Sequence, residues 1–209
     1  MAVPRVVLRR VAKQFGRPSG VFGRVVIARM LNKGNQGTVT AAVEALAPAA
    51  GAVVADIGFG GGIGIGLLLD RVGPNGHVHG VDISSTMISR AARFGTDRLR
   101  LHVGSVTALP LDTASVNGAI CVNTVYFVDD LPTAFGELAR VLVPGGRLVL
   151  GVADPTWMAR MPWAPYGFRL RPVEALLDGL TTAGLRQVDH RRVGTGELAF
   201  HLLVVQRPA

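Results

Sequence analysis

Two acidic residues end successive apolar segments, and a run of glycines follows the first. Asp56 comes just before Ile57 and the glycines of Gly58–Gly64. Asp82 closes the next apolar segment, which starts at His77. A buried strand that enters a glycine-rich turn and then a helix sets bare backbone N–H groups against a nucleotide-like ligand, and an acid after the second strand typically accepts hydrogen bonds from ribose hydroxyls. The pattern therefore indicates a nucleoside-binding site.

The spacing of the glycines distinguishes between two classes of ligand. A dinucleotide fingerprint requires G-x-G-x-x-G, with its third glycine where the helix packs on the strand. Counted from each alternate glycine in turn, that position holds Ile63, Ile65 or Leu67. The acid two residues before Gly58 would also repel a diphosphate, whereas it suits a ligand that carries an ammonium group. The spacing thus argues against a nicotinamide-dependent oxidoreductase.

Two further segments complete an ordered series of motifs. Leu99–Val103 is typical of a third strand and leads into Gly104-Ser105-Val106. A fourth strand at Gly118–Val122 precedes Asn123-Thr124-Val125-Tyr126-Phe127. With these motifs, the chain from Val53 onward resembles the class I S-adenosylmethionine-dependent methyltransferases, of the small-molecule type found in ubiquinone, menaquinone and natural-product pathways.

The resemblance implies S-adenosylmethionine as cofactor and S-adenosylhomocysteine as its product. Asp56 and the glycines would hold the methionine part, and Asp82 the ribose. The residues implied to bind the cofactor are Asp56, Gly58, Phe59, Gly60, Gly62, Asp82, Ile83, Met87, Gly104, Ser105, Val106, Asn123 and Thr124. Relatives usually carry an aspartate at the position of Ser105, and an uncharged hydroxyl is a weaker acceptor for the adenine amino group.

An aromatic and methionine-rich segment follows the fifth strand, between Ala153 and Arg171. Relatives use this insertion as a lid over the methyl acceptor, and such a lining suits a flat or apolar small molecule. The expected acceptor-binding residues are Tyr126, Trp157, Met161, Trp163, Tyr166 and Phe168. Tyr126 is also the candidate catalytic residue. The alternative is a loop that only packs over the edge of the sheet.

From Val53 onward, strands alternate with helical segments, which predicts a mainly parallel sheet with helices on both faces. The final stretch, Arg186–Arg207, has no intervening helix and predicts an antiparallel hairpin. We therefore expect a Rossmann-like three-layer α/β sandwich with a seven-stranded sheet. Residues 51–209 would form the cofactor-binding domain, and residues 1–50 a helical cap over the cofactor cleft.

The N-terminal segment predicts three short helices. Residues 1–20 alternate basic and apolar side chains, which is typical of an amphipathic helix that packs on the core or touches a membrane surface. Phe22–Leu31 would form a second helix and Asn32–Gly37 a turn. Thr38 would cap a third helix, through Leu46. Within this cap, Met30, Asn32 and Asn35 are candidates to reach the cofactor or the acceptor.

The composition restricts the partners. The formal net charge of +8 comes largely from basic residues ahead of the first acid, Glu44, and no run interleaves aromatic and basic residues. Asn123-Thr124-Val125-Tyr126 lacks the two prolines of the methyltransferases that act on adenine in DNA, which argues against nucleic acid. Cys121 is alone, which fits a reducing cytoplasm and argues against arsenite methylation, since related enzymes use several cysteines for it. No histidine pair has metal-ligand spacing beside a carboxylate, so no metal is expected. No apolar run is long enough to span a membrane.

The sequence therefore predicts methyl transfer from S-adenosylmethionine to a small, apolar or aromatic acceptor, with O- or C-methylation favoured. The protein would mainly align the acceptor and exclude water. Two alternatives stay open: a catalytically silent relative that only binds the cofactor or its product, and a nucleic acid methyltransferase. The oligomeric state and the identity of the acceptor do not follow from the sequence.

Overall fold

The computed structural model of the chain describes residues 5–16, 28–194 and 199–209. Within these residues the strands form one sheet in the order β3-β2-β1-β4-β5-β7-β6. The strands are β1 (Val53–Ile57), β2 (His77–Asp82), β3 (Leu99–Val103), β4 (Val116–Val122), β5 (Leu142–Ala153), β6 (Arg186–Val193) and β7 (Phe200–Gln206). β1 to β5 pair in parallel, whereas β7 runs antiparallel to both β5 and β6. The predicted seven-stranded sheet with a C-terminal antiparallel hairpin is confirmed for the described part of the chain.

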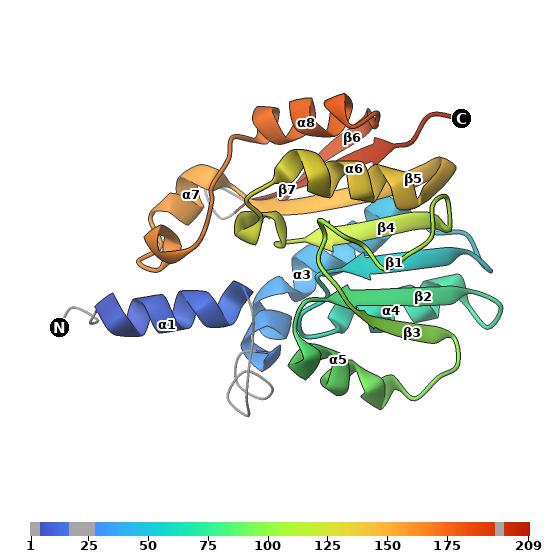
Figure 1. Cartoon of the computed structure of the whole chain (residues 1–209), viewed down its shortest axis with the longest axis horizontal. Coiled ribbons are helices and arrows are strands. Elements are labelled where there is room, and N and C mark those ends of the chain that lie inside the picture. Colours follow the sequence, from blue (N-terminus) through green and yellow to red (C-terminus); the bar gives the residue numbers. More distant parts are fainter. Residues whose placement is uncertain (1–4, 17–27, 195–198) are drawn as a thin grey trace.

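Helices cover both faces of this sheet (Figure 1). The covering helices are α3 (Ala28–Leu46), α4 (Ile63–Val72), α5 (Ser85–Ala91), α6 (Leu131–Val141) and α8 (Val173–Thr182). Two further described helices, α1 (Arg5–Gly16) and α7 (Pro155–Ala159), lie beyond one end of the sheet, and single 3-10 turns form at η2 (Ala92–Phe94), η3 (Val125–Phe127) and η4 (Ala164–Tyr166). Among the helices that the structure describes, none is long and apolar enough to cross a membrane.

The core divides into two apolar clusters, one on each face of the sheet. Successive residues of a strand point to opposite faces, so on β4 Ile120 joins the cluster with α3, α4 and α5, whereas Cys121 joins the cluster with α6 and α8. Both side chains are fully buried. Burial on both faces explains why these strands read as continuous apolar runs rather than as alternating patterns.

The sheet order reverses at β1. β2 and β3 lie on one side of β1, and β4 and β5 lie on the other. In open α/β sheets, loops leave the carboxyl ends of two adjacent strands in opposite directions at such a point and open a crevice for a ligand. The topology therefore places the binding site at the carboxyl ends of β1 and β4.

One N-terminal prediction is wrong. The expected turn at Asn32–Gly37 is part of the continuous helix α3, and Thr38 is a buried residue inside that helix rather than its cap. The buried side chains of Val39 and Leu46 join the α4 side of the core, and such packing outweighs the intrinsic cost of glycine, about 1 kcal/mol per residue. Most of the expected helix at Phe22–Leu31 lies outside the described residues.

Candidate functional site

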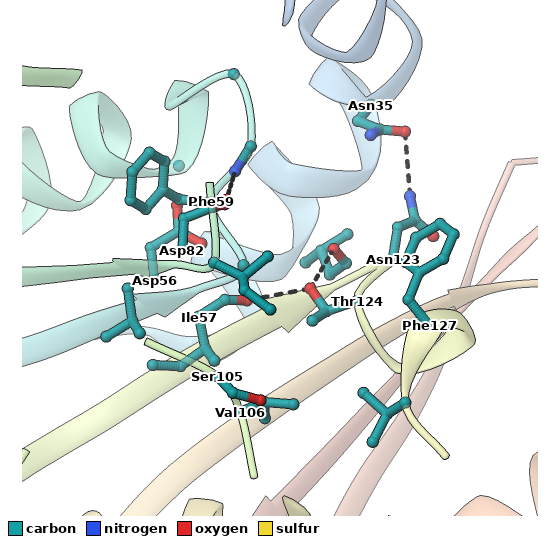
Figure 2. Close-up of a pocket in the computed structure, with 18 of the residues that line it drawn as sticks. Asn35, Asp56, Ile57, Phe59, Asp82, Ser105, Val106, Asn123, Thr124 and Phe127 are labelled. Atoms are coloured by element: carbon teal, nitrogen blue, oxygen red, sulfur yellow. Dashed lines mark hydrogen bonds between the residues drawn. The ribbon is translucent and has the colours of Figure 1, made fainter. Parts of the chain in front are cut away.

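A cavity of about 500 Å³ opens at the carboxyl ends of β1, β2 and β4. Most of the residues expected at the cofactor line it: Asp56, Gly58, Phe59, Gly60, Asp82, Ile83, Gly104, Ser105, Val106, Asn123 and Thr124. Gly62 and Met87 do not line it. Met87 is fully buried in the core beside α4. Figure 2 shows the two acids on one side of the cavity and Asn123, Asn35 and Phe127 on the other.

Asp56 is an acid with little compensation from its surroundings. It belongs to β1 and is 4% exposed. Burial, and secondly the charge of Asp82, raise the pKa of its carboxyl group to about 8. A Cβ atom at Gly64 would lie 2.3 Å from Asp56 Oδ2. Glycine at the start of α4 therefore leaves the space that this carboxylate occupies.

Asp82 holds the glycine turn against the end of β2. Its Oδ2 accepts a hydrogen bond from Gly60 N at 2.9 Å, and its Oδ1 accepts one from Ser84 N at 2.8 Å. Burial raises the pKa of Asp82, and these two bonds lower it in part. The next residue, Ile83, is 42% exposed although it is large and apolar. An apolar surface beside a fixed carboxylate fits a nucleoside, whose base is flat and whose ribose carries hydroxyl donors.

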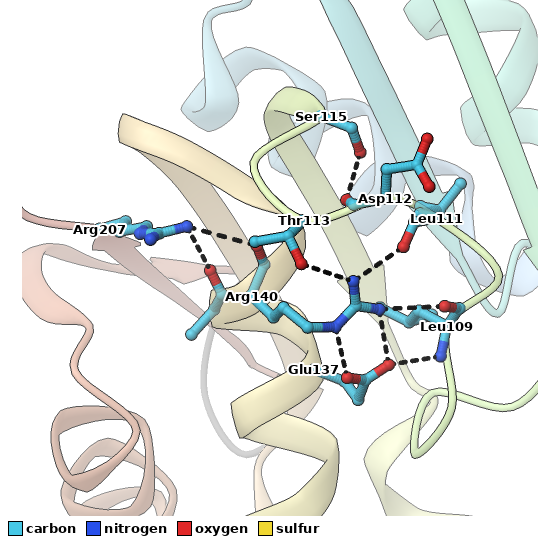
Figure 3. Close-up of polar contacts among 9 residues, drawn as sticks. Leu109, Leu111, Asp112, Thr113, Ser115, Glu137, Arg140 and Arg207 are labelled. Carbon is cyan, nitrogen blue, oxygen red and sulfur yellow. Dashed lines mark hydrogen bonds and ion pairs between the residues drawn. The ribbon is translucent and has the colours of Figure 1, made fainter.

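The loop after β3 forms the floor of the cavity and is tied to α6. Glu137 Oε2 accepts a hydrogen bond from Leu109 N at 2.7 Å. Arg140 donates to Leu109 O at 3.1 Å and to Leu111 O at 2.9 Å (Figure 3). Glu137 and Arg140 also form an ion pair, with 2.6 Å between Oε1 and Nε. We call these two residues the Glu137–Arg140 clamp, since they hold the segment that continues from Ser105.

Ser105 uses its hydroxyl within its own loop. Its Oγ lies 2.8 Å from Thr107 Oγ1 and accepts a hydrogen bond from Thr107 N at 3.2 Å. One lone pair of a hydroxyl oxygen stays available beyond these contacts when Ser105 donates to Thr107. The residue can thus accept one bond from a ligand in the cavity, without the charge that an aspartate would bring.

Thr124 and Gly58 form the junction between β1 and β4. Thr124 Oγ1 donates to Ile57 O at 3.2 Å. A Cβ atom at Gly58, where φ is +73°, would lie 2.2 Å from that same Oγ1. Glycine at position 58 is therefore required by the approach of Thr124 as well as by the turn, a reason that the motif alone does not reveal.

The outer end of the cavity is mainly apolar. Its lining includes Ala12 of α1, Val39 of α3, Phe127, Val128, Tyr166 and Gly167. The guanidinium carbon of Arg9 lies 5.7 Å from the centre of the Tyr166 ring, so α1 meets η4 at the mouth of the cavity. Figure 1 shows α1 and α7 beyond the same end of the sheet. We call α1 and residues 164–167 the cover.

Of the expected acceptor-binding residues, only Tyr166 lines the cavity. Trp157, Met161 and Phe168 pack against the α6 side of the core instead. The structure does not bring Trp163 into the lining either. In this structure, three of these side chains pack on the core, as the alternative interpretation of the segment predicts.

The structure also places Tyr126 outside the cavity. Its side chain is 5% exposed, and its hydroxyl accepts a hydrogen bond from Ala153 N. Burial raises the pKa of this phenol. Tyr126 is thus unsuited to act as a base in the cavity, and its contact with β5 makes it a structural residue.

Several lining residues were missed by sequence reasoning. Ala12, Val39 and Val128 carry no chemical group that could have singled them out. Phe127 and Gly167 follow Tyr126 and Tyr166, two of the expected acceptor-binding residues. Asn35 is one of the three N-terminal residues expected to reach the cofactor or the acceptor. The side chains of the other two, Met30 and Asn32, lie outside the described residues.

Comparisons with known proteins identify the family. A family model described as a methyltransferase domain matches residues 55–150. An arsenite methyltransferase of Halobacterium salinarum is 36% identical over 78% of this chain and 40% of its own length. The aklanonic acid methyltransferase DauC of Streptomyces is 29% identical over 82% of this chain and 77% of its own. The chain belongs to the class I S-adenosylmethionine-dependent methyltransferases.

A solved structure extends the likeness to the fold. The geranyl diphosphate C-methyltransferase of Streptomyces coelicolor, in complex with S-adenosyl-L-homocysteine, has a TM-score of 0.70 and 18% identity, with 93% of this chain and 87% of that chain covered. The chain spans less than half the length of several curated relatives that it matches.

The cavity fits the cofactor of this family. An ammonium group would stabilise the carboxylate of Asp56, whose pKa is raised by burial and by the charge of Asp82. Ribose hydroxyls would find the fixed carboxylate of Asp82, and the exposed side chain of Ile83 offers a surface to adenine.

Proposed function

We propose that this protein transfers a methyl group from S-adenosylmethionine to a small-molecule acceptor, with O- or C-methylation favoured. The observation that carries the proposal is the pair of buried acids, Asp56 and Asp82, at the ends of adjacent parallel strands in one cavity. The two carboxyl groups in one cavity suit a ligand that carries an amino acid part and a nucleoside part.

When bound, S-adenosylmethionine supplies a methyl group that is already activated on a sulfonium. The task of this chain is to hold and orient. Asp56 would bind the ammonium group, Asp82 the ribose, and Ile83 and Val106 would enclose the adenine. The backbone of Gly58–Gly60 leaves room for the methionine part, because no side chain projects there except the buried ring of Phe59.

The outer end of the cavity supports an acceptor with an apolar body. Phe127, Val128 and Tyr166 line it, and the cover would limit the access of water to a bound acceptor. Alignment and desolvation can contribute several kcal/mol to such a transfer. Among the lining residues that the structure describes, the only acids are Asp56 and Asp82, both on the cofactor side. The proposal therefore assigns no general base.

Arsenite is a poor candidate for this chain. The arsenite methyltransferase of Halobacterium salinarum is a relative, but Cys121 is the single cysteine of the present sequence. It is fully buried, and burial raises the pKa of its thiol to about 12. A buried, protonated thiol does not bind a thiophilic oxyanion.

The charge and exposure of α1 bear on where the protein acts. Val6 is 76% exposed and Val7 46% exposed, beside the exposed Arg5. This combination supports a peripheral contact with an anionic membrane surface in addition to packing on the core. The single buried cysteine fits a cytoplasmic location, where thiols stay reduced.

The test is a thermal melt with S-adenosylhomocysteine beside NADH. A ligand at about 100 times its dissociation constant adds about 2.7 kcal/mol to the free energy of unfolding. We expect S-adenosylhomocysteine to raise the melting temperature and NADH to leave it unchanged. The absence of a shift with S-adenosylhomocysteine would overturn the proposal. Binding without methyl transfer to any member of a broad acceptor pool would instead identify a silent relative.

A further inference from the structure

We propose that Asn123 binds the hydrogen-bond-donating group of the methyl acceptor through its side-chain oxygen, and that Asn35 positions it for this. The inference rests on the proposed function, since it concerns the outer half of the same cavity. It specifies the acceptor as a molecule with an O–H or N–H group on an apolar body.

The first observation is a missing partner. The Oδ1 atom of Asn123 is buried, and within the described structure it has no hydrogen-bond partner. Buried polar atoms nearly always have partners, and a native exception calls for an explanation such as a bound ligand. Asn123 lines the cavity, so a ligand that enters beside it can supply the missing donor.

The second observation is that the rest of this amide is held in place. Asn123 Nδ2 donates to Asn35 Oδ1 at 3.1 Å (Figure 2). The bond joins the end of β4 to α3, so Asn35 controls the direction in which the oxygen of Asn123 points. The backbone N–H of Asn123 donates to Gly151 O at 2.8 Å, which anchors the residue from below.

The third observation is the backbone of Asn123. Its φ is +57°, a left-handed conformation that few residues other than glycine adopt. Such conformations persist where the surrounding structure requires them and cluster at functional sites. Here the conformation occurs at the end of β4, where Asn123 lines the cavity together with Thr124 and Phe127.

The position of Asn123 separates it from the sites that the cofactor would use. Asp56 and Asp82 stand on the opposite side of the cavity (Figure 2), and they supply the acceptors for an ammonium group and a ribose. Asn123 shares its side with Phe127 and with Asn35 of α3. The family resemblance implies a cofactor role for Asn123, and the proposal departs from it by assigning the donor on this side of the cavity to the methyl acceptor.

The chemistry of the amide oxygen defines the class of acceptor. It accepts hydrogen bonds and donates none, so it favours hydroxyl and amine groups. A carboxylate would place one acceptor against another and is disfavoured. The apolar neighbours Phe127 and Val128 favour a flat or hydrocarbon body around that donor.

The experiment uses four probes of one shape: a naphthol, the corresponding naphthylamine, the methyl ether of the naphthol, and the naphthoate. Their affinities are measured by calorimetry on the whole chain, with and without saturating S-adenosylhomocysteine. We expect the naphthol and the naphthylamine to bind about tenfold tighter than the ether, and the naphthoate to be the weakest.

The variants test the two asparagines separately. Asn123→Gly removes the oxygen and suits the left-handed backbone, so it should abolish the preference for the naphthol over the ether. Asn35→Leu should reduce the preference for the naphthol over the ether. Asn35→Asp should retain that preference, because its carboxylate still accepts a bond from Asn123 Nδ2. Gln187→Leu, on the exposed face of β6, is the control and should change nothing.

Equal affinity of the unaltered protein for the naphthol and its ether, or a lack of binding of all four probes, would overturn the inference. A preference that survives in Asn123→Gly would do the same. Binding of S-adenosylhomocysteine is measured on the same samples. If it binds normally and the probes are not distinguished, only the acceptor assignment fails. If it does not bind, the proposed function fails, whatever the probes do.

Discussion

We call the carboxyl ends of β1, β2 and β4, together with the loop after β3, the inner wall of the cavity. The inner wall and the cover are held in very different ways. The inner wall rests on strand ends, on two hydrogen bonds to Asp82 and on the Glu137–Arg140 clamp. The cover rests on packing of α1 and on the contact between Arg9 and Tyr166. A fixed wall suits a ligand that never changes, and a lightly held cover suits the entry of an acceptor. The structure thus separates binding of a constant cofactor from admission of a variable partner.

Asp82→Ala should have the largest effect on the stability and ligand binding of the inner wall. The substitution leaves Gly60 N and Ser84 N without their partner and removes the ribose acceptor. We expect a loss of about 2–4 kcal/mol of unfolding free energy and loss of measurable S-adenosylhomocysteine binding by calorimetry. Asp82→Asn keeps one acceptor oxygen, so its stability and its affinity for S-adenosylhomocysteine should lie between those of the unaltered protein and those of Asp82→Ala. Unchanged affinity in Asp82→Ala would remove Asp82 from the ribose site.

Asp56→Asn should change the stability of the protein and its affinity for the cofactor in opposite directions. The pKa of Asp56 is raised to about 8 in the folded protein, whereas the ordinary value for an aspartate is 3.8. Its contribution to stability is therefore fully present below pH 4 and declines as the pH rises toward 8. The variant should be more stable than the unaltered protein at pH 8 and equal to it near pH 4, as measured by urea denaturation.

The same substitution should weaken cofactor binding. An ammonium group favours the ionised form of Asp56, so binding below pH 8 should release a proton. Affinity of the unaltered protein for S-adenosylhomocysteine should therefore increase from pH 6 to pH 8, and this trend should be absent in Asp56→Asn. Calorimetry in buffers of different ionisation enthalpy measures the released proton directly. A flat profile in both proteins would contradict the ammonium assignment.

Arg140→Ala tests whether the clamp matters for the cavity floor. It removes the bonds to Leu109 O and Leu111 O and leaves Glu137 without its cation. We expect a loss of about 1–3 kcal/mol in stability and a smaller, several-fold loss of S-adenosylhomocysteine affinity, because the segment from Ser105 onward loosens. Arg147→Ala, at an exposed site on β5, is the control. A stability loss with full cofactor affinity would show that the floor holds its shape without the clamp.

Arg9→Ala should have the smallest effect and should act on the cover alone. An exposed cation–π contact contributes about 0.5–1 kcal/mol, so global stability should change little. Binding of a naphthol should change by a few-fold, while S-adenosylhomocysteine affinity should stay within error. Arg5→Ala, one turn earlier on α1, provides the matched control. An equal loss of both ligands would mean that cover and wall are one unit.

The sequence predicted the inner wall better than the cover. The order of strands, the glycine turn and the two acids follow from local patterns, because a strand end, a tight turn and a helix start all depend on neighbouring residues. Most of the residues expected at the cofactor do line the cavity. The cover depends on how segments far apart in the chain meet, and there the aromatic side chains of 157–168 misled the prediction.

Two residues illustrate the limit. Tyr126 has a functional group in a suitable place along the chain, yet its hydroxyl is taken by Ala153 N across the core. Asn35 lies in a segment expected to be a turn, yet helix α3 carries it to Asn123, 88 residues away. In both cases a contact between distant segments determines the role of the side chain, and the neighbouring residues in the sequence do not indicate that role.

By itself, the sequence determined the family, the sheet with its terminal hairpin and the pair of acids that mark the cofactor. Tertiary structure alone decided which side chains line the outer end of the cavity, why the pKa of Asp56 is raised, and that the side-chain oxygen of Asn123 has no partner among the described residues. The physical reason is that strand ends and turns are specified by neighbouring residues. Burial, desolvation and hydrogen bonds between distant segments exist only once the layers have packed.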